Sequence, residues 1–453
     1  MRSIPRTGLR ARDAMKSVSH LPVNDSTNGW SRILPHRSPK PPLKSDIRVH
    51  TVVVGAGYSG LAATRRMAEN RPNEKIVLLE AHEVGENASG RNSGFAIDLP
   101  HVISSNMNEL EGAHRHMKLS RTAIAYHEEQ IDKHNIQCDW KQSGKYQTAV
   151  TDYGIRKYLE PFMRELEQLQ EPYTYVDGPE LSNTLGTRHF SGAVYTPGCR
   201  LLNPAALVRG LADTLPENAV LYEHTPVIGI DCSNSIHLKT PSGSVHADRL
   251  IIGVNAFARY FGFYTRHILP FAANASLSRK LTADEQASLG CKEPWGVTPA
   301  NAFASITMRY TEDHRILIRQ NIYFNRRMRE SQDYQDRIAR LHKRLFDERF
   351  PMLPEVSMEY TWTGYLALSQ NGAPGFGQIA ENIYSCVCQN AIGVTKGTIS
   401  GMLAADMACG EDHELIGYMQ KLGKPNPLPP TPFLDIGVRA KLLWEMWNAR
   451  KEV

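Results

Sequence analysis

The sequence lacks the features that mark several common classes of protein. No apolar run reaches about 18 residues, so we expect no membrane-spanning helix. The seven cysteines are scattered, and only Cys386 and Cys388 lie close together, so their spacing indicates neither a zinc site nor a disulfide framework. Scattered cysteines are typical of reduced thiols. We therefore predict a cytoplasmic protein that binds no metal.

The chain also lacks a concentration of charge of one sign on a single element. Its formal net charge is +5 at pH 7, and much of this excess lies in residues 1–45. A nucleic-acid-binding face shows clustered Lys and Arg, so we predict no nucleic-acid partner. At 453 residues the chain is too long for one ordinary domain and fits two or three interleaved ones.

A glycine-rich segment in the N-terminal part is the strongest motif. β-Branched residues over 49–54 predict a buried strand, which ends in the turn Gly55-Ala-Gly-Tyr-Ser-Gly60. A helix is expected at 58–70 and a second buried strand at 75–80. Together these elements form a βαβ unit of about 30 residues, the context in which such turns bind dinucleotides.

Each glycine of this turn has a physical task. Gly55 permits a tight turn, Gly57 lets the backbone approach a pyrophosphate, and Gly60 lets the helix pack closely on the strand. The helix N-terminus offers free N–H groups and a positive dipole end to the anion. Glu80 ends the second strand, where a carboxylate accepts hydrogen bonds from a ribose and disfavours the 2′-phosphate of NADP. The motif alone leaves FAD and NAD open.

The segment that follows resembles a known family. Residues 85–95 read Gly-Glu-Asn-Ala-Ser-Gly-Arg-Asn-Ser-Gly-Phe. This is similar to the second signature of the D-amino-acid-oxidase-like (DAO) FAD-dependent oxidoreductases, with Asn87 and Ser93 where glycine is common. Further segments resemble the family in order and spacing: residues 202–208, 225–227, 254–256 and 362–406. Within the family, the chain looks closest to the gamma-glutamylputrescine-oxidase-like branch.

The resemblance implies an α/β fold. We expect a Rossmann-type FAD-binding domain of the glutathione-reductase-like kind, with an interleaved α+β substrate domain built on an antiparallel sheet. The expected FAD-binding domain is discontinuous, over residues 46–105, 195–265 and 360–410. The other expected segments are an extended N-terminal arm at 1–45, the substrate domain at 106–194 and 266–359, and a C-terminal extension at 411–453.

FAD, held non-covalently, is the cofactor that the resemblance implies. In the family, small residues of this signature approach the flavin, Arg91 and Asn92 supply donors, and a helix N-terminus near Gly393 faces the flavin edge that gains negative charge. His82 and Cys386 are the candidate residues for covalent attachment, and neither lies in an attachment context. The expected FAD-binding residues are Gly55, Gly57, Tyr58, Ser59, Gly60, Glu80, Ala81, Ala88, Ser89, Arg91, Asn92, Ser93, Gly94, Val227, Asn255, Gly393, Val394, Thr395, Lys396 and Gly397.

The chemistry of the family is oxidation of a C–N bond. The substrate carbon gives a hydride to flavin N5, and water hydrolyses the resulting imine, so the protein mainly positions the substrate. The implied partners are an amine or amino acid and an electron acceptor, O2 or another. A strong general base is not required if the amine binds neutral. The rivals are an NAD-linked dehydrogenase and a flavin-binding chaperone or non-catalytic subunit.

Candidate catalytic residues come from the second domain and the closing turn. Arg309 and Tyr310 match a family segment on the substrate side of the flavin, where Arg309 would bind a substrate carboxylate. Lys396 would face the flavin edge or assist oxygen reduction. The remaining candidates share these neighbourhoods or follow the flavin loop: Arg319, Tyr323, His101 and Tyr365.

The C-terminal tail predicts an amphipathic helix. Val438, Leu442, Leu443 and Met446 share one predicted face, and Trp447 lies beside them. Docking onto the body of the protein or onto another subunit is the first interpretation, and it is compatible with a homo-oligomer. A membrane-surface helix, or a contact to a quinone or a partner chain, is the alternative.

Overall fold

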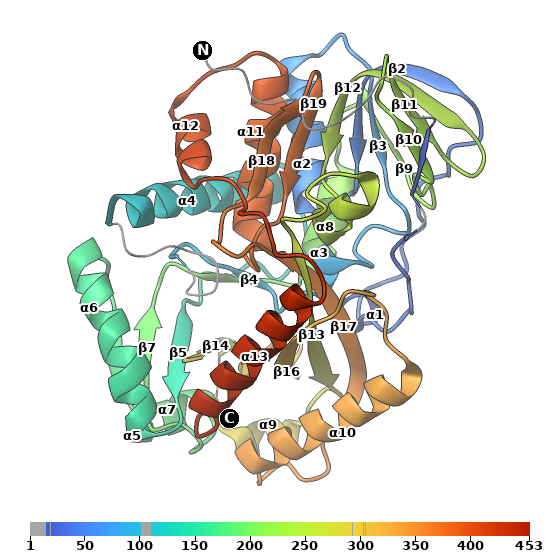
Figure 1. The fold of residues 1–453 in the computed structure, drawn as a ribbon. Coiled ribbons are helices and arrows are strands. Elements are labelled where there is room, and N and C mark those ends of the chain that lie inside the picture. The colour runs from blue at the N-terminus through green and yellow to red at the C-terminus, as the bar shows by residue number, and fades with distance from the viewer. Residues whose placement is uncertain (1–14, 19, 101–109, 292, 302, 304) are drawn as a thin grey trace.

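The strands of the molecule form two large sheets. The computed structural model describes residues 15–18, 20–100, 110–291, 293–301, 303 and 305–453. His101, one of the candidate site residues, lies outside them. The two sheets occupy opposite halves of the molecule, with helices against both (Figure 1). A short pair, β4 (Phe95–Ala96) with β8 (Arg200–Leu201), lies between the halves.

The first sheet carries the glycine-rich turn. Its strands are β1 (Lys16–Ser17), β2 (Ile47–Val54), β3 (Ile76–Leu79), β9 (Ala219–Tyr222), β10 (Gly229–Asp231), β11 (Ile236–Lys239), β12 (Ser244–Ile252), β18 (Gly375–Ala380) and β19 (Ile383–Val387). The central strand β2 runs parallel to β3 and β12, with Val54 opposite Leu79 and Ile252. The carboxyl ends of three strands therefore meet at one edge, where parallel sheets bind their ligands.

The composition of β2 explains its central position. Val52 and Val53 are fully buried and belong to hydrophobic clusters on opposite faces of the strand. On one face, Val53 packs with Met67 of α2 (Tyr58–Asn70) and Ala404 of α11 (Thr398–Ala408). On the other, Val52 packs with residues of β10 and β12, such as Ile230. A β-branched run covered on both faces is typical of a parallel strand.

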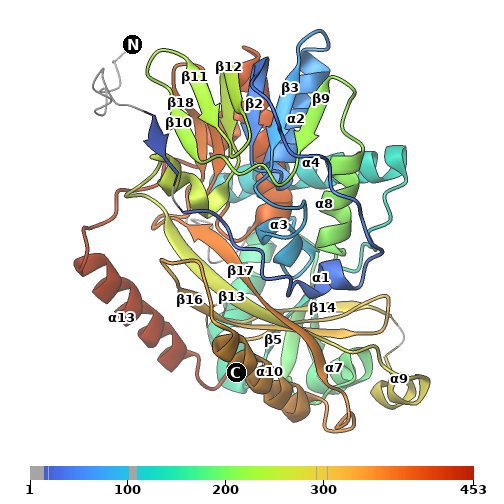
Figure 2. The same ribbon diagram turned by 90° about the vertical axis from the view of Figure 1, so that its right-hand side faces the viewer.

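The remaining helices surround the two sheets. They are α1 (Gly29–Arg32), α3 (Ala88–Arg91), α4 (Leu110–His134), α5 (Asp152–Gly154), α6 (Glu160–Leu169), α7 (Gly178–Leu185), α8 (Pro204–Asp213), α9 (Ala283–Leu289), α10 (Gln332–Arg349), α12 (Glu414–Lys421) and α13 (Phe433–Asn448). Irregular helical turns are η1 (Ile155–Leu159), η2 (Asn255–Phe261) and η3 (Gly393–Gly397). Figure 2 shows α10 beneath the second sheet and α13 at the edge of the molecule.

The second sheet has eight strands and is almost wholly antiparallel. Their order is β17 (Met358–Leu368), β13 (Leu269–Ser278), β16 (Ile316–Phe324), β15 (Thr307–Tyr310), β14 (Trp295–Pro299), β5 (Lys145–Ala149), β7 (Gly192–Thr196) and β6 (Thr174–Asp177). Only the pair β14 and β5 is parallel. The α/β fold with a second, antiparallel layer is thus confirmed, apart from that one pair.

Two expected elements differ in detail from the structure. The helix whose N-terminus we expect near Gly393 begins as the π-helical turn η3 before continuing as α11. Residues 360–368, which we assigned to the FAD-binding segment, lie on β17 of the second sheet, because β17 pairs with β13 along its length. The strand therefore carries the chain from the second sheet back to the first.

Gly60 offers a sharp test of how the first helix packs on its strand. A Cβ at this position would lie 1.8 Å from the carbonyl oxygen of Gly55, a backbone atom that cannot move aside. We expect Gly60→Ala to destabilise the protein by about 3 kcal/mol or more. Thermal unfolding followed by circular dichroism measures the effect.

The matched control is a glycine with free space around it. Gly417 lies in α12, and a Cβ there meets no atom within 4 Å. Gly417→Ala should raise stability by about 1 kcal/mol, because alanine favours the helix. Equal melting temperatures for the two variants would contradict the close packing at Gly60.

Candidate cofactor and substrate site

Two adjoining cavities lie at the carboxyl edge of the first sheet. The turn cavity, of about 1030 Å³, surrounds the glycine-rich turn and includes Gly55, Glu80 and Val227. The sheet cavity, of about 1340 Å³, lies between this turn and the second sheet and includes Thr307 and Arg319. Residues that line both are Gly57, Ala88, Ser89, Arg91, Gly253, Asn255 and Tyr365. The shared lining makes one long site suited to an extended ligand.

The glycine-rich turn places backbone close to the turn cavity. Gly55 has a φ of 97°, a conformation that favours glycine. A Cβ on Gly57 would lie 2.5 Å from the Ser89 hydroxyl oxygen. The carboxylate of Glu80 accepts hydrogen bonds from the backbone N–H of Ala56 (2.8 Å) and of His82 (3.1 Å). Burial raises the pKa of Glu80, and these two hydrogen bonds oppose that rise.

The loop after β3 is held by its own side chains. Arg91 is buried and donates to the backbone oxygens of Glu86 (2.7 Å) and Thr363 (3.1 Å). The Asn92 side chain donates to the Ser89 carbonyl at 2.6 Å. Asn87, where the family pattern has glycine, has a φ of −114°, which any residue adopts. The departure at Asn87 therefore leaves the loop conformation intact.

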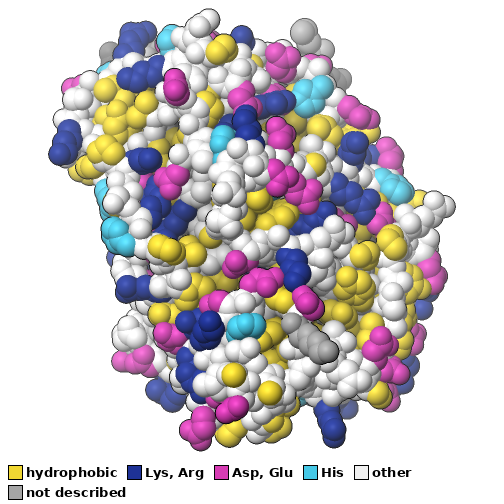
Figure 3. All heavy atoms as spheres, turned by 180° about the vertical axis from the view of Figure 1, so that it is seen from behind, with side chains coloured by type: hydrophobic (Ala, Val, Ile, Leu, Met, Phe, Trp, Pro, Cys, Tyr) yellow, Lys and Arg dark blue, Asp and Glu magenta, His cyan; other side chains and the backbone are white. Residues whose placement is uncertain are grey.

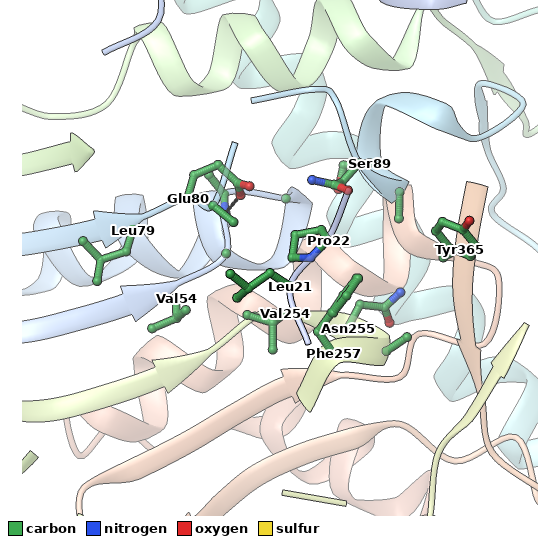
Figure 4. Close-up of a pocket in the computed structure, with 18 of the residues that line it drawn as sticks. Leu21, Pro22, Val54, Leu79, Glu80, Ser89, Val254, Asn255, Phe257 and Tyr365 are labelled. Atoms are coloured by element: carbon green, nitrogen blue, oxygen red, sulfur yellow. Dashed lines mark hydrogen bonds between the residues drawn. The ribbon is translucent and has the colours of Figure 1, made fainter. Parts of the chain in front are cut away.

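The N-terminal arm covers the turn cavity, which the sequence did not indicate. Residues 20–23 line this cavity, and Figure 4 shows Leu21 and Pro22 lying across from Glu80. Asp25 forms an ion pair with Arg91 at 2.6 Å. Further on, the indole N–H of Trp30 donates to the carbonyl of Asn92 at 2.9 Å. The arm is thereby tied to the same loop that borders both cavities.

The closing segment borders the sheet cavity from the first sheet. Gln389, Asn390, Ala391, Gly393 and Val394 line it, just after β19. We did not single out Gln389, Asn390 or Ala391, although their place after a parallel strand was a signal for them. Among the described residues, the buried side-chain oxygens of Asn255 and Gln389 have no hydrogen-bond partner. Such acceptors fit a ligand that carries N–H or O–H donors.

Several expected cofactor residues lie behind the cavity walls. Gly60 lets α2 pack closely on the Gly55 carbonyl, and Gly397 lies near the Ser59 side chain. The Thr395 hydroxyl donates to the Ile97 carbonyl at 3.1 Å. Lys396 is buried but lines neither cavity. The expected residues that do line a cavity are Gly55, Gly57, Tyr58, Ser59, Glu80, Ala81, Ala88, Ser89, Arg91, Asn92, Ser93, Val227, Asn255, Gly393 and Val394.

Arg309 lies outside both cavities, contrary to our expectation of a substrate contact. Its guanidinium donates to the carbonyls of Gly94 (2.8 Å) and Leu202 (2.6 Å) and lies over the rings of Trp30 and Phe95. Burial lowers the pKa of Arg309 to about 10. Backbone oxygens of the loop after β3 and of Leu202 thus accept hydrogen bonds from this charge, and Arg309 joins the two segments.

Gly94 is expected to bind the cofactor but instead makes room for Arg309. Its φ is 73°, and a Cβ there would lie 2.2 Å from Nη1 of Arg309 and from the Leu202 carbonyl oxygen. Tyr310 also lies outside both cavities, because its hydroxyl is hydrogen-bonded to Nδ1 of His314 at 2.8 Å within the second sheet's core. Arg309 and Tyr310, which match the family segment, thus contact other parts of the protein and line neither cavity.

Arg319 is the expected residue whose side chain does reach the sheet cavity. It lies on β16 and donates to the Thr307 hydroxyl at 2.6 Å. Burial lowers the pKa of Arg319 to about 10, so the group stays charged at neutral pH. Tyr365 of β17 lines both cavities. Tyr323 lines neither, and its hydroxyl contacts Glu330 at 2.5 Å.

Comparison with known proteins identifies the family. The profile of the family described as FAD dependent oxidoreductase (DAO) matches residues 50–407. The chain belongs to this family. It is 25% identical over 378 residues to gamma-glutamylputrescine oxidoreductase of Escherichia coli, covering 82% of this chain and 85% of that one. It is also 25% identical to the oxidoreductase OrdL of Haemophilus influenzae, covering 83% and 86% of the two chains.

Solved structures of similar fold agree with this assignment. Glycine oxidase from Geobacillus kaustophilus superposes with a TM-score of 0.68 at 18% identity, covering 82% of this chain and 98% of the other. L-proline dehydrogenase from P. horikoshii superposes with a TM-score of 0.64 at 16% identity, covering 85% and 100%. At these identities the likeness concerns the fold.

The cofactor of this family member is FAD, and the residues present fit it. The turn cavity offers glycine backbone and the Glu80 carboxylate to the adenosine half, and the sheet cavity offers the unpartnered oxygens of Asn255 and Gln389 to the flavin half. An NAD-linked dehydrogenase is thereby disfavoured. Among the described residues, no cluster of His, Cys, Asp or Glu could hold a metal ion.

The two candidate residues for covalent attachment, His82 and Cys386, make other contacts. The His82 ring nitrogen Nε2 lies 2.8 Å from the Pro22 carbonyl oxygen. Cys386 is buried in β19, where its thiol contacts the Ile252 carbonyl oxygen, and burial raises its pKa to about 12. The described residues that line the sheet cavity include no His or Cys. These positions support the prediction of non-covalent FAD.

The contact between Asp25 and Arg91 tests whether the arm retains the cofactor. Although burial opposes it, hydrogen bonding to Arg91 lowers the pKa of Asp25, so the pair is ionic at neutral pH. We expect Asp25→Ala to raise the Kd for FAD about tenfold, since a charge-assisted hydrogen bond contributes about 1.5 kcal/mol. Quenching of flavin fluorescence during titration measures this Kd.

Asp46→Ala is the matched control, because the Asp46 carboxylate accepts a hydrogen bond from the Ser244 hydroxyl at an exposed position in the first-sheet half and lines neither cavity. Its Kd for FAD should equal that of the unaltered protein. An unchanged Kd in Asp25→Ala would show that the arm does not contribute to FAD retention.

Proposed function

We propose that this protein oxidises the C–N bond of an amine or amino acid that carries a carboxylate. The family supplies the redox cofactor, and similar proteins are named for the oxidation of gamma-glutamylputrescine, glycine and L-proline. When bound, FAD accepts the hydride that leaves the substrate carbon. The protein then has to bind the substrate, orient it and exclude competing reactions.

The charge of the sheet cavity is the observation that supports a carboxylate. Arg319 and Arg91 both border this cavity, and Arg91 forms an ion pair with Asp25. The described residues that line the cavity include no Asp or Glu. A guanidinium binds a carboxylate bidentately, whereas a doubly charged diamine would meet only repulsion here. The cavity thus favours an amino acid or an amine with an acidic group.

The lining also supports binding of the amine in its neutral form. No described side chain of Asp, Glu, His or Lys lines the sheet cavity, so none is available there as a base. Burial raises the pKa of Tyr365 above its ordinary value, so its hydroxyl stays protonated at neutral pH and is not available as a base. Tyr365 and Thr307 can instead orient the amine by hydrogen bonds. Water must then hydrolyse the imine product.

The rival in which the chain is a flavin-binding subunit without chemistry is disfavoured by this cavity. A purely structural flavoprotein has no need of a charged space of this size beside the loop after β3. The electron acceptor (O2 or another), the cytoplasmic location and a homo-oligomeric state stay predictions.

The absorbance spectrum of the purified protein is the first experiment. Bands near ~370 and ~450 nm indicate oxidised flavin, the cofactor that this chemistry requires. Under anaerobic conditions, amino acids, N-substituted amino acids and simple diamines are then added in turn. We expect bleaching by a carboxylate-bearing amine and none by the diamines. Bleaching by diamines alone would show that the carboxylate proposal is wrong.

Removal of Arg319 tests the carboxylate contact directly. We expect Arg319→Gln to raise KM for a carboxylate-bearing substrate about 100-fold, because a charge-assisted contact is lost, while kcat changes less. Arg319→Lys should recover part of the affinity. Arg344→Gln is the control, since Arg344 is exposed on α10. An unchanged KM in Arg319→Gln would exclude this role.

The pH profile tests the predicted part played by Lys396. Burial lowers the pKa of Lys396 to about 8, with the nearby Cys388 thiol opposing that shift. The ammonium is therefore present below pH 8 and lost as the pH rises through that value. If its charge assists turnover, kcat falls as the pH rises above 8. Neither Lys396→Met nor Lys396→Arg should show this fall. A fall of kcat above pH 8 that persists in Lys396→Met would contradict the prediction.

A further inference from the structure

The C-terminal helix α13 presents its apolar side chains to solvent. The exposed fractions are 69% for Phe433, 64% for Ile436, 68% for Leu443, 60% for Trp444 and 62% for Trp447. These five side chains lie on the side of the helix that faces away from the protein. We call this side the outer face of α13. Leu443 and Met446, expected on the same face as Val438, are thus exposed. Figure 2 shows α13 at the margin of the molecule.

The opposite side of α13 already packs on the protein. Leu434, Val438 and Leu442 join the hydrophobic cluster of the second sheet that includes Phe271 and Ile322. This inner stripe fixes which side of the helix faces out. The outer face is therefore a second apolar surface, and no described residue covers it.

Both ends of α13 are anchored. Arg326 pairs with Asp435 at 3.4 Å near the start of the helix. Beyond its end, the buried Glu452 accepts a hydrogen bond from the backbone N–H of Val150 at 2.7 Å and contacts the Thr151 hydroxyl. The helix is thus held in place rather than free to turn its apolar side inward.

In residues 433–453, the acidic side chains contact the body of the protein, whereas the exposed charged side chains are basic. Asp435 and Glu445 face Arg326 and Asn301 of the body, and Glu452 is buried. The exposed charged residues of the segment are all basic: Arg439, Lys441, Arg450 and Lys451. On the helix wheel, Arg439 and Lys441 fall on opposite flanks of the apolar stripe. The face of the molecule away from α13 differs, because acidic and basic side chains intersperse there (Figure 3).

We propose that the outer face of α13 docks on an anionic lipid bilayer, with the helix lying in the plane of the interface. An apolar stripe with tryptophans, flanked by Lys and Arg, is the pattern by which helices bind such surfaces. Tryptophan rings favour the headgroup region, and each Lys or Arg near an anionic surface adds attraction. The guanidinium of Arg450 already lies 4.4 Å from the centroid of the Trp447 ring, so both groups face the same side.

Spanning is excluded for this helix by its length. α13 has 16 residues, fewer than the roughly 20 that cross a bilayer. No described helix of the protein is long and apolar enough to cross one. The apolar stripe can therefore only lie along the interface.

A second copy of the chain fits this face less well than lipid does. Two outer faces packed together would bring Arg439, Lys441 and Arg450 of both copies into one interface. The acidic residues that could neutralise them face their own protein body, as Asp435 does. Like charges brought together in this way oppose association.

Docking would bring one wall of the substrate site to the bilayer. Ala273, Ile322 and Leu366 line the sheet cavity and also belong to the cluster on which α13 packs. The helix therefore lies directly over this wall. The docking proposal rests on α13 alone and does not depend on the proposed reaction.

Vesicle binding by the full-length, FAD-loaded protein tests the proposal. Vesicles of phosphatidylcholine alone are compared with vesicles that contain 30% phosphatidylglycerol in ~100 mM salt, at a Debye length of about 10 Å. We expect cosedimentation with the anionic vesicles at least tenfold above that with the neutral ones, and weaker binding in ~500 mM salt. Brominated lipid should quench part of the tryptophan fluorescence, because Trp444 and Trp447 are exposed.

Variants then separate the apolar and the basic contributions. Trp444→Ser with Trp447→Ser should lower binding about tenfold or more and remove the quenching, whereas Met352→Ser, at an exposed apolar site elsewhere, should not. Arg439→Gln with Lys441→Gln should weaken binding to anionic vesicles. Lys44→Gln with Arg48→Gln, which removes the same charge from exposed positions in the first-sheet half, should not. Retained flavin absorbance shows that each variant is folded.

Two outcomes would overturn the proposal. One is equal, weak binding of the unaltered protein to both kinds of vesicle. The other is a dimer in sedimentation equilibrium that Trp444→Ser with Trp447→Ser converts to monomer, which would assign the face to a second copy. A protein that fails to bind vesicles but whose flavin is still reduced by substrate would contradict the docking proposal alone. The docking proposal and the proposed reaction can therefore fail independently.

Discussion

Close approach of backbone to backbone at the first βα turn is the constraint on which the rest of the site depends. Gly60 of α2 lies against the carbonyl of Gly55, and Gly401 of α11 lies against the carbonyl of Ser59, at distances that leave no room for a Cβ. Both helices can therefore reach the carboxyl edge of the first sheet. The N-terminal end of α2, at Tyr58 and Ser59, borders the sheet cavity, and a helix N-terminus favours a ligand with negative charge.

The second sheet contributes to FAD binding indirectly as well as by lining a cavity. Arg309 extends from β15 to the carbonyls of Gly94 and Leu202, and the indole N–H of Trp362 on β17 donates to the Arg91 carbonyl at 2.9 Å. The arm binds the same loop through Trp30. Three separate parts of the chain thus support one short loop, which gives that loop a defined conformation beside the flavin.

Electrostatics distinguish the two ends of the long site. At the adenosine end, Glu80 is a buried acceptor beside backbone donors, which suits a ribose hydroxyl. At the other end, Arg319 provides positive charge with no described carboxylate on the cavity wall. A ligand bound along both cavities therefore meets donors and acceptors suited to different chemical groups. This difference supports an acidic substrate at the flavin end.

Local sequence patterns were sufficient for the first βα unit. A β-branched run, three spaced glycines and a terminal glutamate predicted β2, the helix at 58–70 and the glycine and Glu80 lining of the turn cavity, because these features depend on neighbours in the sequence. Much of the sheet cavity's flavin-side wall was predicted from the family resemblance. The composition of the tail likewise indicated an amphipathic helix before its position was known.

Tertiary structure decided what depends on distant contacts. Arg309 and Arg319 lie ten residues apart on adjacent antiparallel strands, and only the packing of the second sheet shows that one supports a loop while the other enters the cavity. The arm's place over the turn cavity follows from contacts such as Asp25 with Arg91, 66 residues apart. The sequence by itself determined the cofactor fold, because its signals are local. Substrate contacts and the exposed side of α13 were set by which surfaces the folded chain brings together.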